Sequence, residues 1–391
     1  MLPAAAEPAS EPGYSAAVAS DEPVRPDYRG ACISRVVPVL RAPGAHREPW
    51  VPDLLSEARQ VVLLVVDGLG WEQMLEHRAE LPTLCGAEGG PVTSVAPTTT
   101  ATALTSITTG RTPAEHGVLG YRMALPPASA GGPRPVLNVL RWSAGGDMRA
   151  LLPARSLQRF TPFEAPGVPV VTRAEFTSSG FTAVHLSGTR ITGWRMPSTL
   201  VVGVHRLLAA GEPFVYAYYD GIDKVAHEYG LGEQYAAELR AVDRMVGDLV
   251  GGLPPGAALV VTSDHGQVDV PGMAILPGPE IMAHISLLSG EGRFRWLHAR
   301  PGAADDLAKA AEEAFGDEAW VKTREQIVDE GWFGGPLRPE AADRLGDVAL
   351  VARAPVAFLD PADPGETRLL ARHGSLTSAE MYVPLIAWSA P

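Results

Sequence analysis

Acidic side chains and a histidine follow three apolar runs of the sequence, each just beyond the end of its run. They are Asp67 after residues 61–66 (VVLLVV), Asp220 and Asp223 after 214–219 (FVYAYY), and Asp264 with His265 after 258–262 (ALVVT). A helix cap or a turn explains any one of these acids. Three strand ends at one edge of a sheet would instead gather carboxylates that repel one another, and divalent cations would neutralise that repulsion.

Two more histidines extend this set of potential metal ligands. Asp223 and His227 are four residues apart, so on a helix they share one face, although an exposed Asp–His pair is a simple alternative. His373 precedes a glycine in RHGSLTSAEMYVPLI, which alone is more often a turn. Aspartates and histidines without cysteine suit two Zn²⁺ ions, and Mn²⁺ is also compatible. The other seven histidines lack such a context and are expected to be structural.

The stretch SVAPTTTATALTSITTG, residues 94–110, holds seven threonines. Pro97 disfavours a helix before it, and Gly110 is a typical residue to end one, so the sequence predicts a helix that begins near Thr99 or Thr100. Its free N–H groups and positive dipole end would attract phosphate. Thr98 or Thr99 could cap this helix, while the Thr100 hydroxyl could contact a cation and become a nucleophile.

The elements that position these residues indicate an α/β fold. The apolar runs suit strands buried on both faces of a parallel sheet, and helical patterns such as residues 232–253 alternate with them. We therefore predict a doubly wound, mostly parallel sheet flanked by helices over residues 31–391. Residues 275–345 predict a small α+β insertion, with strands near 293–299 and 319–322 and a helix over 303–315. It is either a lid over the site or an ordinary extension of the sheet.

Composition bounds the partners and the compartment. The formal net charge of -13 argues against binding nucleic-acid polymers or anionic membranes, although a local phosphate site is compatible with it. Two cysteines provide neither a disulfide framework nor a cysteine metal site. Residues 1–30 lack the features of a signal peptide, and their Pro, Ala and acidic bias predicts a disordered tail. No apolar run approaches the ~20 residues of a membrane span, so we expect a cytoplasmic protein.

The ordered set of motifs resembles the alkaline phosphatase superfamily, and most closely its nucleotide pyrophosphatase/phosphodiesterase branch. That branch has an Asp after its first strand and a Pro-Thr-x-Thr stretch whose second Thr is the nucleophile, ten residues before a Gly. The matching segments are Asp67, PTTT ending at Thr100 with Gly110, PAEHGV at 113–118, Asp223-x-x-x-His227-x-x-Gly230, SDHG at 263–266, and HG at 373–374.

By this resemblance, one zinc would be held by Asp67, Thr100, Asp264 and His265, and the other by Asp223, His227 and His373. Asp220 is a reserve ligand. Thr100 would form a covalent phospho-threonine intermediate during hydrolysis of a small phosphorylated substrate, possibly a nucleotide. The resemblance has no bearing on the oligomeric state.

The sequence also departs from that branch. Tyr121 occupies the position of an Asn that contacts phosphate, so its hydroxyl is the candidate replacement, with Arg122 as an additional charge. ATAL after the nucleophile looks more like the small-residue helix of the phosphomonoesterases. A phosphodiesterase or nucleotide pyrophosphatase is the favoured reading. A phosphomonoesterase or phosphonate hydrolase is the alternative, and a non-catalytic binding protein is less favoured because all seven expected metal-site positions are filled.

Overall fold

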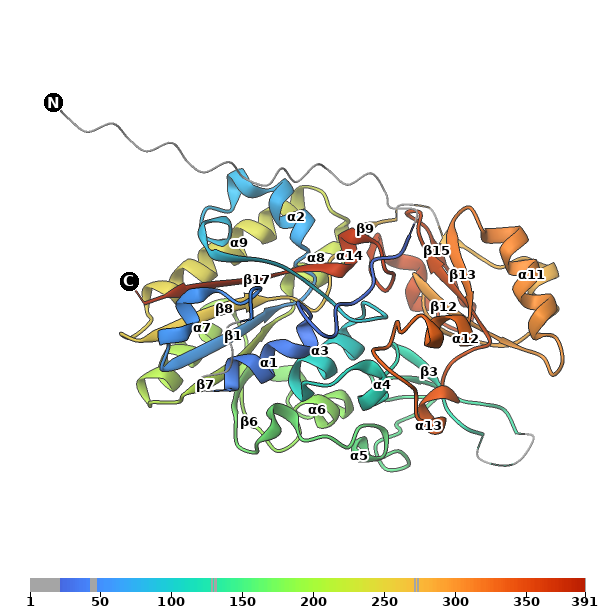
Figure 1. The fold of residues 1–391 in the computed structure, drawn as a ribbon, viewed down its shortest axis with the longest axis horizontal. Coiled ribbons are helices and arrows are strands. Elements are labelled where there is room, and N and C mark those ends of the chain that lie inside the picture. The colour runs from blue at the N-terminus through green and yellow to red at the C-terminus, as the bar shows by residue number, and fades with distance from the viewer. Residues whose placement is uncertain are drawn as a thin grey trace.

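A seven-stranded sheet forms the centre of the computed structural model, with helices on both faces (Figure 1). The structure describes residues 22–42, 48–127, 129, 132–270, 272 and 274–390. The strand order is β2 (Glu88–Thr93), β17 (Tyr382–Ser389), β8 (Ala257–Thr262), β1 (Gln60–Val66), β7 (Phe214–Tyr219), β5 (Pro169–Arg173) and β6 (Arg190–Trp194). The five strands from β8 to β6 are parallel, and β17 runs antiparallel to β8 and β2. This confirms the predicted mostly parallel α/β fold.

Strand β1 is apolar throughout because both of its faces are covered. Val61, Leu63 and Val65 belong to the hydrophobic core on one side of the sheet, and the alternate residues Val62, Leu64 and Val66 belong to the core on the other side. Successive side chains of a strand point to opposite faces, so a doubly covered strand reads as a continuous apolar run.

The two cores are closed by different helices. The first includes side chains of α1 (Ile33–Arg41), α3 (Thr100–Thr109) and α6 (Gly180–His185). The second includes side chains of α2 (Trp71–Glu76), α7 (Pro197–Ala209), α8 (Gly221–Tyr229) and α9 (Glu233–Gly251). Helix α3 therefore packs on the sheet. Its first residue, Thr100, lies at the carboxyl ends of the parallel strands, where Asp67 and Asp264 follow β1 and β8.

A second sheet of four strands lies in the region predicted as an α+β insertion. Its order is β11 (Ile285–Glu291), β12 (Phe294–Ala299), β14 (Val348–Ala352) and β13 (Ala319–Thr323), so it extends beyond the predicted end at 345. Leu297 and Leu350 pack with Leu307 and Phe315 of α11 (Ala304–Phe315) in a separate core. Phe294, Trp296 and Val351, which alternate with them, join the first core of the main sheet.

The remaining described elements are short. They are β3 (Arg122–Ala124), β4 (Val136–Asn138), β9 (Val268–Asp269), β10 (Ala274–Ile275), β15 (Ala357–Phe358), β16 (Ala371–Arg372), α4 (Pro113–His116), α5 (Ala154–Leu157), α10 (Pro279–Met282), α12 (Arg324–Asp329), α13 (Pro339–Ala342) and α14 (Ser378–Met381), with 3-10 turns such as Ala174–Phe176 and Pro364–Arg368.

Most of the tail predicted over 1–30 lies outside the described residues. Its described end, residues 22–30, lies against the folded chain: the Val24 N–H donates to the Leu376 carbonyl (2.9 Å), and the Tyr28 hydroxyl donates to the Trp332 carbonyl (2.8 Å).

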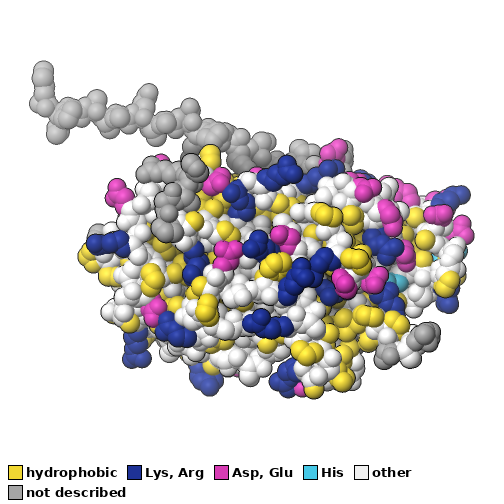
Figure 2. Space-filling model, turned by 60° about the horizontal axis from the view of Figure 1, so that its bottom comes forward, with side chains coloured by type: hydrophobic (Ala, Val, Ile, Leu, Met, Phe, Trp, Pro, Cys, Tyr) yellow, Lys and Arg dark blue, Asp and Glu magenta, His cyan; other side chains and the backbone are white. Residues whose placement is uncertain are grey.

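The surface in view in Figure 2 carries Lys and Arg side chains in small groups, with acidic and apolar side chains between them. In the part of the chain that the structure describes, no helix is long and apolar enough to cross a membrane. The cytoplasmic location stays a prediction.

Candidate active site

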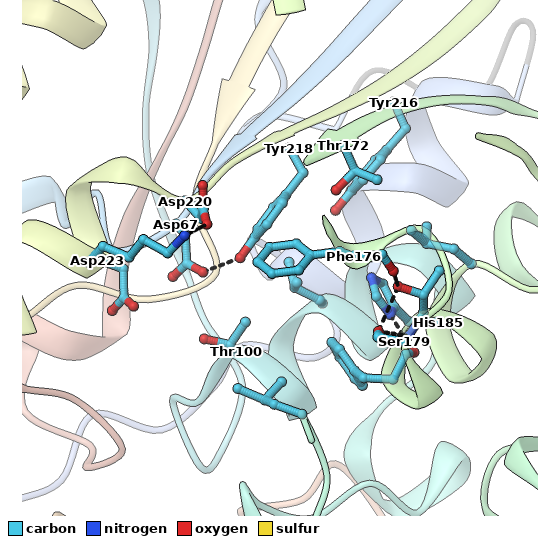
Figure 3. A pocket seen from close by; sticks show the side chains of 16 residues that line it. Asp67, Thr100, Thr172, Phe176, Ser179, His185, Tyr216, Tyr218, Asp220 and Asp223 are labelled. Atoms are coloured by element: carbon cyan, nitrogen blue, oxygen red, sulfur yellow. Dashed lines mark hydrogen bonds and ion pairs between the residues drawn. The ribbon is translucent and has the colours of Figure 1, made fainter. Parts of the chain in front are cut away.

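The predicted ligand residues come from separate elements and meet at the carboxyl ends of the parallel strands. Asp67 follows β1, Asp264 and His265 follow β8, Asp223 and His227 lie on α8, and His373 follows β16. Thr100 is the first residue of α3. Figure 3 shows Thr100 facing Asp67 and Asp223, with the Tyr218 hydroxyl pointing at the Asp67 carboxylate.

The first group of side chains surrounds one nitrogen of a buried histidine. The Nε2 atom of His265 lies 3.4 Å from Asp67 Oδ1, 3.4 Å from Asp264 Oδ2 and 3.2 Å from the Thr100 hydroxyl. Among the described residues, Asp67 Oδ1 and Asp264 Oδ2 are buried and have no hydrogen-bond partner. The other oxygen of Asp67 accepts a hydrogen bond from Tyr218. Two buried oxygens without a donor are suited to a cation.

The second group is centred on Asp223. Its Oδ1 atom lies 3.3 Å from His227 Nε2 and 3.7 Å from His373 Nε2, and it accepts a hydrogen bond from the Gln267 amide (2.6 Å). The ring of His373 stacks on that of His265 with 3.5 Å between the ring centroids, so the two groups adjoin. Among the described residues, one three-residue cluster whose ligand atoms all lie within 4.8 Å of one another contains Asp223, His265 and His373, without His227.

All three histidines hold the same ring nitrogen against a carbonyl oxygen. Nδ1 lies 3.0 Å from the Gly266 oxygen in His265, 2.7 Å from the Ala371 oxygen in His227, and 2.8 Å from the Thr98 oxygen in His373. A carbonyl only accepts, so each Nδ1 carries the hydrogen and each Nε2 presents a lone pair to carboxylate oxygens. A lone pair on Nε2 that faces a lone pair on a carboxylate oxygen is repelled unless a cation lies between them. The hydrogen bond from Nδ1 to a carbonyl is typical of histidines whose other ring nitrogen binds a metal.

Burial controls the charge states of these groups. It raises the pKa of Asp67, an effect that repulsion from Asp264 and Asp223 increases, and it raises the pKa of Asp264 to about 6. Burial lowers the pKa of His265 to about 4 and that of His373 to about 3, so both rings are neutral near pH 7. The site therefore combines neutral imidazoles at His265 and His373, which are competent ligands, with two carboxylates, those of Asp67 and Asp264, whose ionisation is penalised until a cation is present.

Helix α3 begins where it was predicted to begin, with Thr99 as N-cap and Gly110 in the left-handed conformation (φ 64°) at its end. Neither Thr98 nor Thr99 caps it with a side chain. The Thr98 hydroxyl instead donates to the Ser375 carbonyl (2.7 Å) and accepts from the Gly374 N–H (3.0 Å). Thr98 thus ties the nucleophile segment to the segment that carries His373.

Two charged side chains considered from the sequence have other partners. Asp220 pairs with Arg173 through three contacts of 2.6–2.9 Å and with the Lys224 ammonium at 2.5 Å, so its charge is already neutralised. Arg122 pairs with Asp360 and lies 3.6 Å from Asp363. Neither residue belongs to the two groups of ligand-type side chains.

A cleft of about 560 Å³ opens in front of Thr100 and is lined by Tyr121, Glu291 and His373, among others. The Tyr121 hydroxyl accepts a hydrogen bond from the Asn138 amide (2.6 Å), so its own hydrogen remains free to donate. Burial raises the pKa of Tyr121, which keeps that hydrogen in place at neutral pH.

The second sheet reaches this cleft through Glu291 at the end of β11. One carboxylate oxygen of Glu291 accepts a hydrogen bond from the Tyr121 N–H (2.9 Å), while the other oxygen is buried without a partner among the described residues. Burial raises the pKa of the Glu291 carboxyl group to about 8. A Cβ on Gly374 would meet Glu291 Cγ at 2.7 Å, so the glycine after His373 permits this close approach. Sequence reasoning missed Asn138 and Glu291 because neither stands in a local motif.

A comparison with known protein families covers most of the chain that carries these residues. The family model for type I phosphodiesterase/nucleotide pyrophosphatase matches residues 61–135 and 172–376, more than half of the chain, and all seven ligand-type residues described above lie within these ranges. No curated protein sequence matches the chain.

Solved structures share the fold at low sequence identity. Murine ectonucleotide pyrophosphatase/phosphodiesterase 5 is 18% identical with a TM-score of 0.60, covering 84% of this chain and 87% of that one. The phosphonoacetate hydrolase of Sinorhizobium meliloti 1021, in complex with phosphonoacetate, is 18% identical with a TM-score of 0.59, covering 88% and 92%. An inactive variant of the murine protein in complex with AMP is 17% identical with a TM-score of 0.61, covering 84% and 87%. The chain thus belongs to the type I phosphodiesterase/nucleotide pyrophosphatase family of hydrolases.

Proposed function

We propose that this protein hydrolyses phosphate diesters with two bound divalent cations and with Thr100 as nucleophile. The observation that carries the proposal is the set of three Nε2 lone pairs turned toward carboxylate oxygens. Two of these oxygens, Asp67 Oδ1 and Asp264 Oδ2, are buried and have no donor among the described residues. A bound cation would make this arrangement favourable while the carboxylates stay ionised.

The ligands would divide into two sets. Asp67, Thr100, Asp264 and His265 would hold one ion, and Asp223, His227 and His373 the other. The mixture of nitrogen and oxygen donors without cysteine suits Zn²⁺, and Mn²⁺ is compatible. When bound, such ions lower the pKa of a coordinated hydroxyl group or water and offset negative charge on the phosphorus oxygens.

The reaction would proceed in two displacements. The Thr100 oxygen attacks phosphorus in line, an O–P bond forms, and the bond to the leaving oxygen breaks. Water then attacks the phospho-threonine, which restores the Thr100 hydroxyl. The Ala101 N–H, in the first turn of α3, would stabilise an equatorial oxygen. A threonine-to-alanine change in the inactive murine relative is consistent with this role.

Tyr121 would replace the phosphate-contacting asparagine of the family. Its hydroxyl is positioned by Asn138 and its backbone by Glu291, which leaves one O–H free to donate to a non-bridging oxygen. Asn138 would be a positioning residue in this scheme.

Two cavities meet at Thr100, and this favours a diester because a diester carries a substituent on each side of phosphorus. A phosphonate substrate is the second candidate, because phosphonoacetate hydrolase shares the fold.

The test compares bis-p-nitrophenyl phosphate, p-nitrophenyl phosphate and phosphonoacetate, each with and without chelator. We expect the diester to be the best substrate, chelator to abolish turnover, and Thr100→Ala to be inactive. The adjacent Thr99→Ala is the matched control, because Thr99 makes no side-chain cap contact. Turnover that survives in Thr100→Ala would refute the proposed nucleophile.

A further inference from the structure

The three ligand-type aspartates are held in place in different ways. Asp264 is held mainly by the backbone, because its Oδ1 atom accepts two backbone N–H groups, at 3.1 and 3.2 Å. Asp67 instead accepts a hydrogen bond from the Tyr218 hydroxyl, and Asp223 accepts one from the Gln267 amide (2.6 Å). Tyr218 and Gln267 belong to neither ligand set, so each contact holds a ligand without adding one.

Tyr218 reaches Asp67 because of the register of two neighbouring strands. Strands β1 and β7 are parallel with Val65 opposite Tyr218, and alternation places Asp67, two residues beyond Val65, on the same face. The Tyr218 hydroxyl donates to Oδ2 of Asp67, a contact marked by a dashed line in Figure 3. Because Oδ2 is held, the other oxygen, which has no partner among the described residues, stays 3.4 Å from His265 Nε2. Tyr218 thus selects the oxygen that faces the first group.

Gln267 reaches Asp223 past a glycine. Gln267 is fully buried in the loop after β8, and Asp223 lies on α8. A Cβ on Gly68, where φ is 77°, would lie 2.8 Å from the Gln267 amide nitrogen and 3.1 Å from Asp223 Cβ, so the missing side chain leaves room for this hydrogen bond. The Gln267 carbonyl in turn accepts a hydrogen bond from the Gln73 amide (2.7 Å), which fixes the backbone of Gln267.

Stability alone does not account for the Gln267 amide. Its Oε1 atom is buried without a partner among the described residues, and an unmade buried hydrogen bond costs about 1–3 kcal/mol. Its nitrogen donates to Asp223 Oδ1, the atom that also lies 3.3 Å from His227 Nε2 and 3.7 Å from His373 Nε2. A carboxylate oxygen has more than one lone pair, so this oxygen can accept the amide and still face a cation. Gln267 thus fixes the oxygen that faces the second group.

The two contacts are independent of each other. Tyr218 and Asp67 are joined between neighbouring strands, whereas Gln267 and Asp223 are joined between a loop and a helix. Among the described residues, neither donor forms a hydrogen bond with the aspartate of the other contact. Removal of one donor should therefore disturb one group and leave the other in place.

We propose that Tyr218 and Gln267 are positioning residues that set the affinities of the two metal sites separately, Tyr218 for the set with Asp67 and Gln267 for the set with Asp223. This inference rests on the proposed function, since it takes the two ligand sets from it. Groups that hold metal ligands in place typically account for about 10- to 100-fold in metal affinity.

The test measures the zinc affinities of the metal-free protein in competition with a fluorescent chelator. Asp264→Asn and His227→Ala identify the two binding steps, because each removes one ligand from one set. We expect Tyr218→Phe to weaken the step that Asp264→Asn weakens, by about 10- to 100-fold. We expect Gln267→Met to weaken the step that His227→Ala weakens by a similar factor. Each variant should change the other step less than about 3-fold, which also shows that it is folded.

Matched controls remove the same chemical groups elsewhere. Tyr216 lies two residues earlier on β7, and its buried hydroxyl has no partner among the described residues, so Tyr216→Phe should change neither step. Gln158 is also buried, and its amide donates to the Phe160 and Val184 carbonyls (3.0 and 2.9 Å). Gln158→Met should lower stability and leave both zinc affinities unchanged.

The outcomes separate this inference from the proposed function. A wild type that binds two zinc ions, with Tyr218→Phe and Gln267→Met weakening neither step or both steps equally, would overturn the positioning roles alone. Should Gln267→Met bind no zinc, Gln267→Ala is measured, and loss of both ions there too would overturn the role of Gln267. Fewer than two zinc ions in the wild type would refute the binuclear function and this inference with it.

Discussion

Replacing Asp264 with asparagine is expected to stabilise the metal-free protein. The carboxyl group is fully buried, and burial with repulsion from Asp223 raises its pKa from 3.8 to about 6. Because the pKa of Asp264 is higher in the folded than in the unfolded protein, the protonated side chain contributes stability that is fully present below about pH 4 and is lost as pH rises through 6. The difference of roughly 2 pKa units means that the free energy of unfolding is lower by about 3 kcal/mol at pH 8 than at low pH, and by roughly half of that at pH 5.

Asparagine keeps the favourable contacts of this side chain. Its oxygen can accept the N–H groups of Gly68 (3.2 Å) and His265 (3.1 Å), as Oδ1 of the aspartate does. Its NH₂ group replaces the unpartnered Oδ2 and faces the lone pair of His265 Nε2 at 3.4 Å. The substitution therefore turns a repulsive contact into a hydrogen bond.

The assay is urea unfolding followed by circular dichroism at pH 8 and pH 5, with EDTA and then with excess Zn²⁺. We expect Asp264→Asn to raise the free energy of unfolding by about 2–3 kcal/mol at pH 8 in EDTA, and to gain less from Zn²⁺ than the wild type. Asp220→Asn is the matched control, because it breaks ion pairs with Arg173 and Lys224 and should destabilise the protein in both conditions. A destabilised Asp264→Asn at pH 8 in EDTA would refute the reasoning that these carboxylates need a cation.

Three further predictions concern the cleft and the metal ions. Burial raises the pKa of Glu291 to about 8 from 4.5, so its contribution to stability is lost as pH rises toward and through 8. The measurement is urea unfolding of Glu291→Gln and the wild type in EDTA at pH 4 and pH 9. The free energy of unfolding of the variant minus that of the wild type should be larger at pH 9 than at pH 4 by on the order of 4 kcal/mol, and the same difference at both pH values would contradict this. Tyr121→Phe should lower kcat/KM roughly 10- to 100-fold by removing a hydrogen bond to a charged oxygen. Asn138→Ala should lower kcat/KM less than Tyr121→Phe does, and combining the two should lower it little further than Tyr121→Phe alone. Additive losses in the double variant would show that Asn138 does not act through Tyr121. Metal analysis of active protein should give about two ions per chain, and fewer would be incompatible with a binuclear site.

The sequence was sufficient to predict the fold and the meeting of Asp67 with Asp264, because both follow from local patterns of residues. Continuous apolar runs predicted doubly covered strands, as in β1, where alternate residues enter the two cores. The carboxyl ends of parallel strands share one edge, so Asp67 and Asp264 were expected to meet before any distance was known.

Contacts that depend on tertiary packing could not be predicted. Glu291 reaches the cleft from the second sheet, and Asn138 meets Tyr121 across the short β3–β4 pair, so no spacing in the sequence marks either residue. Either Thr98 or Thr99 was expected to cap the helix, but Thr99 makes no side-chain cap, and the Thr98 hydroxyl bonds to residues 374 and 375, which are remote in the sequence. A cavity of about 220 Å³ beside Thr100 is lined by side chains of α3, α6 and β7, a property of packing that no single segment contains.

The central claim, that Thr100 forms a covalent intermediate, is tested most directly by the stereochemical course at phosphorus. The substrate would be a diester made chiral at phosphorus by one sulfur atom and by isotopically labelled oxygen. The zinc-loaded protein would hydrolyse it, and the configuration of the product at phosphorus would be determined. Two successive in-line displacements, first by Thr100 and then by water, predict overall retention of configuration. Inversion would show a single displacement by water and would contradict the role assigned to Thr100.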